Sequence, residues 1–188
     1  MAATIDEFIA DATRRMDKSV ESTHEHFNSV RTGRASAALL ERVQVNAYGT
    51  KMPINQVATI GVPEPRLLTI TPFDKSIMRD IEKAIMESDL GLTPANDGQI
   101  VRLPIPQLTE ERRKELVKQV RHLAEEGRVA ARNVRRDALH HLKEAEKNGE
   151  TGSDEVHRAE DRLQKVTDEH VQAIDAALKA KEAEIMEV

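Results

Sequence analysis

The sequence has no cysteine and no tryptophan, and it holds only one tyrosine and three phenylalanines among its 188 residues. Without cysteine, disulfide bonds and thiolate chemistry are excluded. With so few aromatic side chains, a wide aromatic-rich core is not expected, whereas the thin cores of long helices need only Leu, Ile, Val, Ala and Met. The composition therefore favours elongated helical structure.

The sequence also lacks an apolar run that could cross a bilayer, and its first residues show no charged-then-apolar leader. We therefore expect a cytoplasmic protein with no membrane partner. The formal net charge of −5 argues against a generic nucleic-acid binder. However, residues 109–147 carry eleven basic and eight acidic side chains, while residues 150–188 carry five basic and eleven acidic ones. Any affinity for phosphate must therefore be local to one face.

Proline is confined to the span from Pro53 to Pro106. Proline can neither continue a helix nor donate to a strand ladder, and this span contains short alternating apolar segments and one compact amphipathic segment after Asp74. The pattern predicts a small β/α/β domain at residues 31–106, inserted into a helical domain that is formed by residues 1–30 and 107–188. The expected fold class is α+β.

Two short segments, residues 31–36 and 104–108, connect the predicted domains, and together they would form a hinge. The expected hinge residues are Arg31, Thr32, Gly33, Arg34, Pro104 and Pro106. One interpretation of a glycine between two arginines is a flexible joint with a phosphate contact. The other is a plain helix break, and the sequence leaves both open.

Apolar residues recur at steps of three and four in three long segments, at about residues 4–30, 109–147 and 153–185. One apolar seam on each helix predicts an elongated three-helix bundle. The middle helix would span ~57 Å at 1.5 Å per residue. Its expected seam is Leu116, Val120, Leu123, Gly127, Ala130, Val134, Ala138, His141 and Ala145. We interpret His141, and His170 in the last helix, as packing residues.

Basic side chains of the middle helix fall on one side of its helical wheel, within an arc of roughly 100°. They are Lys114, Lys118, Arg121, Arg128, Arg132, Arg135 and Arg136. Because guanidinium groups grip phosphate oxygens two at a time, this strip could lie along structured nucleic acid. Alternatively, it is a solvated basic face that pairs with an acidic neighbouring helix. Intramolecular ion pairing of these arginines would contradict the first interpretation.

No arrangement typical of catalysis is evident in the sequence. Carboxylates sit at helix-surface spacing, and no loop motif supports a Ser-His-Asp or Cys-His arrangement. His24 and His26 are two residues apart and so point to different sides of a helix, while His140 and His141 lack a third convergent ligand. We therefore expect no enzyme activity, no metal site and no cofactor.

Four sequence runs carry a resemblance to a known family: residues 30–35 (VRTGRA), 88–92 (SDLGL), 107–116 (QLTEERRKEL) and 131–138 (ARNVRRDA). They resemble the bacterial ribosome recycling factor (ribosome-releasing factor) family. The resemblance extends from the first helix to residues 181–185 (KEAEI), with the order and spacing of the family. His140, His141 and the linker at residues 149–152 depart from the family pattern.

The resemblance implies an L-shaped, two-domain protein with a tRNA-like shape, in which a three-helix bundle carries a β/α/β domain on a mobile joint. Such a factor acts in ribosome recycling, the step of protein biosynthesis that follows translation termination. It binds the post-termination 70S ribosome in the A/P-site region of the 50S subunit. With elongation factor G and GTP hydrolysis, it splits the ribosome into subunits that are used again.

By the same resemblance, rRNA binding falls on the bundle at Arg132, Arg135 and Arg136, with Arg128 just before them, and the strip adds Arg121. The rRNA would be the 23S rRNA. We expect Arg135 to be the dominant contact and to face solvent, so that its loss weakens ribosome binding without unfolding the protein. We expect a monomer, and a coiled-coil adaptor whose seams serve oligomerisation is the alternative.

Overall fold

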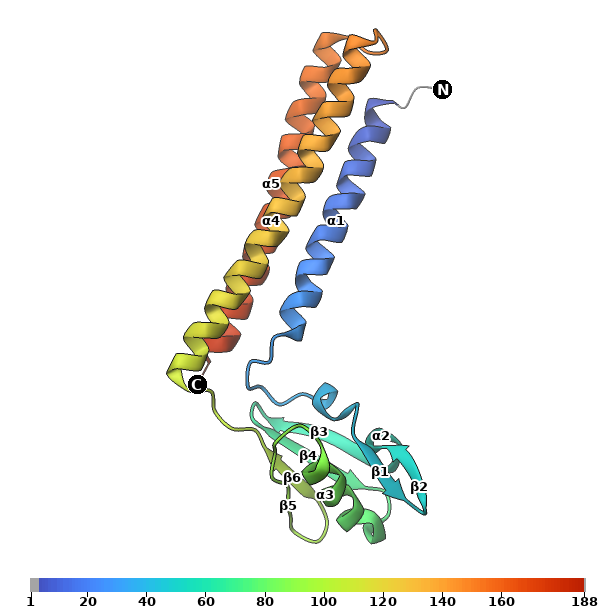
Figure 1. Cartoon of the computed structure of the whole chain (residues 1–188), viewed down its shortest axis with the longest axis vertical. Coiled ribbons are helices and arrows are strands. Elements are labelled where there is room, and N and C mark those ends of the chain that lie inside the picture. The colour runs from blue at the N-terminus through green and yellow to red at the C-terminus, as the bar shows by residue number, and fades with distance from the viewer. Residues whose placement is uncertain (1–3, 188) are drawn as a thin grey trace. The chain divides into compact units, whose positions relative to one another are not determined.

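The computed structural model of the chain describes residues 4–187. Two compact units are present: one combines the chain up to Arg31 with the chain from Glu110 onward, and the other is Thr32–Thr109. The first unit is helical, and the second contains strands and short helices (Figure 1). The α+β class is therefore confirmed. The inserted unit spans residues 32–109, whereas residues 31–106 were expected, so its limits differ by one residue at the start and three at the end.

Three long helices make up the first unit: α1 (Ile5–Ser29), α4 (Glu110–Lys147) and α5 (Ser153–Met186). Each helix contacts the other two, and Figure 1 shows them running side by side. A capping box begins α1. The Thr4 hydroxyl accepts a hydrogen bond from the Glu7 amide at 3.3 Å, and the Glu7 carboxylate accepts one from the Thr4 amide at 2.6 Å. The amides of Thr4 and Glu7, which have no partner within the helix, thereby each gain a hydrogen-bond acceptor.

A glycine turn ends α4 and reverses the chain into α5. Gly149 has φ +72°, a conformation that glycine adopts without the steric penalty of a Cβ. The Glu150 amide donates to the Ala145 carbonyl at 2.9 Å, and the Gly149 amide donates to the Glu146 carbonyl at 3.0 Å. This pair of bonds is the Schellman motif, which satisfies the last carbonyls of a helix. As a result, α5 runs antiparallel to α4.

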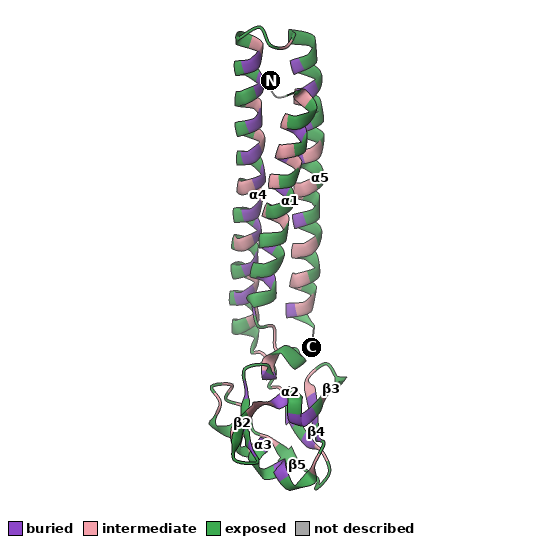
Figure 2. Ribbon diagram, turned by 90° about the vertical axis from the view of Figure 1, so that its right-hand side faces the viewer, coloured by how far each residue is buried: buried purple, intermediate pink, exposed green. Residues whose placement is uncertain are grey.

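The buried seam of α4 faces α1 and α5 together (Figure 2). Its buried residues are Leu116, Val120, Ala124, Gly127, Ala131, Val134, Ala138, Leu142 and Ala145. The expectation for Leu123, Ala130 and His141 was wrong by one position each, because Ala124, Ala131 and Leu142 are the buried residues. Small side chains at the first two positions let two neighbouring helices approach, while Leu123 lies half-buried at the edge of the seam.

The two histidines that were expected to be packing residues behave differently. The side chain of His170 is only 13% exposed, and its Nε2 lies 2.8 Å from a carboxylate oxygen of Asp17 in α1. Its Nδ1 lies 2.6 Å from the Val166 carbonyl, so each ring nitrogen faces an oxygen acceptor. The side chain of His141 is 55% exposed and stacks on the ring of Phe8, with 6.3 Å between the ring centroids. The packing role is confirmed for His170 and wrong for His141.

The second unit contains two antiparallel sheets. One pairs β1 (Gln44–Ala47) with β2 (Thr50–Pro53). The other has the order β3–β4–β6–β5, formed by β3 (Ala58–Glu64), β4 (Leu67–Pro72), β6 (Val101–Pro104) and β5 (Ala95–Asn96). The helices are α2 (Ile54–Val57) and α3 (Met78–Glu87), with 3₁₀ turns η1 (Ala37–Leu40) and η2 (Lys75–Ile77). Its core is separate from that of the bundle and includes Leu40, Ile54, Leu68, Ile70, Ile81, Ile85, Val101 and Leu103.

The β1–β2 hairpin turns through two residues with positive φ, Tyr48 at +54° and Gly49 at +77°. Two such residues match the twist of the flanking strands, but the conformation is unfavourable for a tyrosine. Its hydroxyl donates to the Asp74 carboxylate at 2.7 Å. That hydrogen bond is the largest cause that lowers the pKa of Asp74 below its ordinary value. The hydrogen bonds from the Ser76 amide and side chain lower it further.

Changing Tyr48 to phenylalanine is expected to lower the stability of the second unit at neutral pH. Because the folded pKa of Asp74 is depressed, the contribution is present above the ordinary aspartate pKa and is lost as pH falls through the folded value. The two proteins should therefore converge in acid. Urea unfolding at pH 7 and pH 3 checks this, and an equal difference at both pH values would contradict the carboxylate as the partner.

The two connecting segments, residues 31–36 (the first linker) and 104–108 (the second linker), are both hydrogen-bonded to the turn between β3 and β4. The Ala35 amide donates to the Pro65 carbonyl at 2.7 Å, and the Ile105 amide donates to the Arg66 carbonyl at 2.8 Å. Pro104 is the last residue of β6 and lies inside the sheet. Within the second unit, only residues 32–34 and 106–109 therefore lie beyond these two hydrogen bonds.

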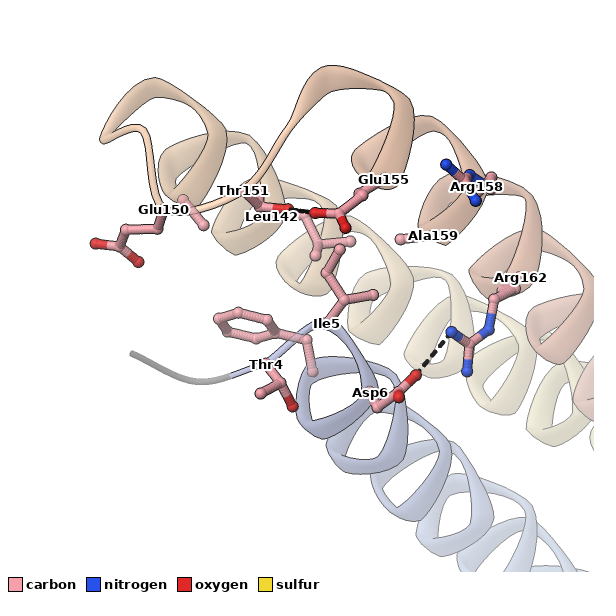
Figure 3. A pocket seen from close by; sticks show the side chains of 12 residues that line it. Thr4, Ile5, Asp6, Leu142, Glu150, Thr151, Glu155, Arg158, Ala159 and Arg162 are labelled. Atoms are coloured by element: carbon pink, nitrogen blue, oxygen red, sulfur yellow. Dashed lines mark hydrogen bonds and ion pairs between the residues drawn. The ribbon is translucent and has the colours of Figure 1, made fainter. Parts of the chain in front are cut away.

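A hollow of about 480 Å³ lies at the end of the bundle where α1 begins and α4 turns into α5 (Figure 3). Asp6 and Arg162 form an ion pair at 2.8 Å on its rim, and the Thr151 hydroxyl donates to the Glu155 carboxylate at 2.8 Å. These polar groups are paired with one another rather than aimed at a common point. The hollow therefore lacks the convergent groups of a catalytic site.

Candidate nucleic-acid interface

All five arginines of the predicted strip lie on α4, a continuous helix of 38 residues without proline. The continuity follows from the sequence, because nothing between Glu110 and Lys147 interrupts the helical hydrogen bonds. Arg121, Arg132 and Arg136 are exposed, whereas Arg128 and Arg135 are half-buried. The structure therefore presents the strip as one row of side chains, but not all of its members face solvent equally.

Arg121 and Arg128 are paired with carboxylates of α5. Arg121 donates from Nε to Glu182, and Arg128 donates from Nε to Asp175 at 2.7 Å. Arg128 also donates to Glu125 at 2.8 Å, and its side chain is only 20% exposed. Burial works against its charge, but the bonds to both carboxylates outweigh this and raise the pKa of Arg128. For these two residues the basic face pairs with an acidic neighbouring helix.

Arg132 is paired more weakly. It shares the carboxylate of Glu125 with Arg128, at 3.3 Å, and both partners are about half exposed. The hydrogen bond from Arg128, and then the charges of Arg128 and Arg132, lower the pKa of Glu125. Exposed ion pairs contribute little stability and exchange readily with other partners. Arg132 can therefore turn to a competing phosphate at low cost.

Arg135 and Arg136 have neutral partners. Arg135 donates to the side-chain oxygen of Gln164 in α5, and Arg136 donates to that of Asn133 at 3.0 Å. In the described part of the chain, neither guanidinium has a carboxylate within ion-pair distance. Among residues 4–187 the Nε of Arg135 is also buried without a hydrogen-bond partner. These two residues keep an uncompensated positive charge and spare donors.

The strip is therefore divided rather than uniform. The condition that would contradict nucleic-acid binding, intramolecular ion pairing, is met by Arg121 and Arg128 and in part by Arg132. It is not met by Arg135 and Arg136. The expectation that Arg135 faces solvent needs correction, because its side chain reaches across to α5 and is half-buried.

Pairing with an acidic neighbouring helix was one of the two interpretations of the strip, but the individual partners on α5 were not predicted. A signal was present, because Arg121, Arg128 and Arg135 are spaced by seven residues, as are Asp168, Asp175 and Glu182. Seven-residue spacing of opposite charges beside two apolar seams is typical of ion pairs between packed helices.

The expected hinge residues lie on both sides of the unit boundary. Arg31 ends the first unit, while Thr32, Gly33 and Arg34 open the second. Gly33 has φ +75°, and a Cβ there would lie 3.1 Å from Cγ of Leu108, a residue of the second linker. The two linkers therefore meet at this glycine.

Other kinds of site find no support within residues 4–187. No group of three histidine, cysteine, aspartate or glutamate side chains is placed to hold a metal ion there. The same residues contain no helix that is apolar and long enough to span a membrane.

The fold and this face define a class of protein: a three-helix bundle with a row of arginines along α4 and an inserted unit of strands and short helices. The family model for ribosome recycling factor matches residues 23–186. The ribosome-recycling factor of Rubrobacter xylanophilus is 58% identical over 96% of this chain and 97% of its own, and that of Geobacillus kaustophilus is 54% identical over the same shares. The chain belongs to the ribosome recycling factor family.

Two solved structures resemble this one. One is a solution structure of the ribosome recycling factor, with a TM-score of 0.71 and 41% identity over the whole of both chains. The other, with a TM-score of 0.62 and 46% identity, covers 98% of this chain and 100% of its own. It belongs to models for the T. thermophilus ribosome recycling factor and the E. coli elongation factor G bound to the E. coli post-termination complex.

Proposed function

We propose that this protein recycles ribosomes after translation termination. It binds the post-termination 70S ribosome at the 50S subunit and, with elongation factor G and GTP hydrolysis, allows the subunits to separate. Family membership supports this role, as does the relative that is described together with elongation factor G on a post-termination complex. The observation that carries the binding step is the uncompensated charge of Arg135 and Arg136 on α4.

The bundle anchors the protein on 23S rRNA through these two arginines, assisted by Arg132. A guanidinium presents several donors in one plane and suits phosphate oxygens. Arg121 and Arg128 contribute less, because they already serve Glu182 and Asp175. Binding should weaken steeply as salt rises, since each neutralised phosphate releases counterions.

The role of the protein is mechanical rather than catalytic, and it is exerted in the cytoplasm. The continuous 38-residue helix α4, packed along α1 and α5, supplies stiffness. The two units act as domains, and the hinge between them involves Thr32, Gly33 and Arg34 in the first linker. Pro104 is not part of this hinge because it is the last residue of β6, whereas Pro106 lies just beyond β6 in the second linker.

The alternative function, an oligomeric coiled-coil adaptor, is less well supported. The apolar seam of α4 is buried against α1 and α5 of the same chain, so it is not free for a second copy. We therefore expect a monomer. Size-exclusion chromatography with light scattering distinguishes the two, because an adaptor would elute as a dimer or larger species.

Replacing Gly33 with proline is expected to slow subunit splitting several-fold and to change ribosome binding little. Proline fixes φ near −65° and cannot adopt the +75° of this position. Gly91→Pro is the matched control, because Gly91 also has positive φ but a Cβ at that position would meet no atom within 4 Å. Equal losses of splitting and binding in Gly33→Pro would contradict a hinge at this residue.

One experiment tests the function as a whole. Post-termination ribosomes mixed with this protein, elongation factor G and GTP should lose light-scattering intensity as the subunits separate. Omission of any one of the three should abolish the change. A signal that is the same with and without the protein would reject the proposed function.

A further inference from the structure

The ion pairs between α4 and α5 repeat every seven residues until they reach the candidate rRNA contact. Arg121 faces Glu182, and seven residues later along α4 Arg128 faces Asp175. Antiparallel packing moves the partner back by seven residues at each repeat. The next pair in this register would be Arg135 with Asp168.

That third ion pair is absent from the described structure, because Gln164 lies between the two charges. The oxygen of its side-chain amide accepts a hydrogen bond from Arg135. The nitrogen of the same amide donates to the Asp168 carboxylate at 2.8 Å. Gln164 therefore bonds to both groups at once and stands where a direct ion pair between Arg135 and Asp168 would otherwise form.

A neutral amide in this position has a consequence for the guanidinium. A carboxylate partner would offset the charge of Arg135, as Glu182 and Asp175 do for the two arginines before it. Gln164 instead fixes one nitrogen of the group and leaves its charge uncompensated. Fixing the side chain in advance also lowers the conformational entropy that would be lost when a ligand binds.

We propose that Gln164 is a positioning residue for rRNA binding, which separates Arg135 from Asp168 and holds the guanidinium ready for a phosphate of the rRNA. This inference rests on the proposed function and assigns a role to a residue of α5 rather than to α4. It explains why the row of paired arginines changes character at Arg135.

Gln164→Glu is the test, because it keeps the shape of the side chain and places a carboxylate against Arg135, while it loses the hydrogen bond to Asp168. Its affinity for isolated 50S subunits is expected to fall about tenfold, the loss of one charged hydrogen bond. The slope of log affinity against log salt should fall by about one, because one phosphate contact is lost. Urea unfolding should show a folded variant with a midpoint only slightly below that of the wild type, because like charges four residues apart on an exposed helix face repel weakly.

Asp168 provides a rescue that a merely structural role for Gln164 would not show. In Gln164→Met, the amide is gone and Arg135 is free to pair with Asp168, so affinity should fall. Adding Asp168→Asn removes that competing charge and should restore most of the affinity. Gln164→Met without loss of affinity, or a double variant as weak as the single one, would overturn the inference.

The controls separate this inference from the function itself. If the wild type binds 50S subunits and Arg135→Ala does not, while Gln164→Glu binds like the wild type, the positioning role is wrong and the function stands. If the wild type fails to bind 50S subunits, the proposed function is wrong and the inference fails with it.

Discussion

Replacing Arg135 with alanine is expected to weaken binding to the 50S subunit by roughly ten- to hundredfold. A hydrogen bond to a charged group contributes about 1.5–3 kcal/mol, and about 1.4 kcal/mol corresponds to a factor of ten in affinity. Arg135 has no carboxylate partner to compete with phosphate in the described structure, so the full contact is lost. Equilibrium binding of labelled protein to 50S subunits at several salt concentrations measures the effect.

Arg121→Ala is the matched control for this prediction. It removes the same charge from the same helix, but from a guanidinium that already serves Glu182. Its affinity should stay close to that of the wild type. Equal losses in both variants would mean that the ribosome senses the overall charge of α4 rather than a contact at Arg135. Wild-type affinity in Arg135→Ala would reject the site.

Because Arg135 is half-buried, the binding measurement needs a measure of folding beside it. The side chain reaches from α4 to Gln164 on α5, so its loss removes a contact between helices as well as a charge. Urea unfolding followed by circular dichroism separates the two effects. A binding loss much larger than the change in the free energy of unfolding is the expected result.

The helices and the inserted unit could be predicted from sequence because their signals are local. Apolar spacing of three and four, the capping box at Thr4 and the glycine at position 149 each act within a few residues. The seam of α4 was less well predicted, and Leu123 was chosen where Ala124 is buried. Hydrophobicity favours the larger residue, whereas close packing against two helices requires the smaller one.

The candidate site was only partly predictable, because its electrostatics depend on α5. The sequence shows which arginines share one side of α4, but the partner of Arg128 is 47 residues away and that of Arg135 is 29 residues away. The register between two packed helices decides which charges are offset. Before that register is known, all five arginines look alike. Afterwards they differ in how far carboxylates offset their charge: fully for two, partly for Arg132, and not for Arg135 and Arg136.

Helices α1, α4 and α5 approach one another closely at Gly127, the residue before Arg128. A Cβ at this position would lie 2.3 Å from the Thr23 hydroxyl oxygen of α1 and 3.2 Å from Cδ1 of Ile174 in α5. The first distance is far below van der Waals contact. The Thr23 side chain is short and donates a hydrogen bond to the Ser19 carbonyl at 2.8 Å, so it cannot move aside and keep this bond. Glycine is therefore required here by packing, since its φ is not in the left-handed region.

Gly127→Ala is expected to destabilise the bundle by about 1–3 kcal/mol through overpacking, although alanine favours a helix over glycine by about 1 kcal/mol. Urea unfolding monitored by helical circular dichroism gives the difference. The control is a double-mutant cycle with Thr23→Ala, which removes the oxygen that the new methyl group would meet. The double variant should recover most of the stability of Thr23→Ala alone, because the propensity gain remains and the clash is gone. Additive losses would place the cost elsewhere than in this contact between α1 and α4.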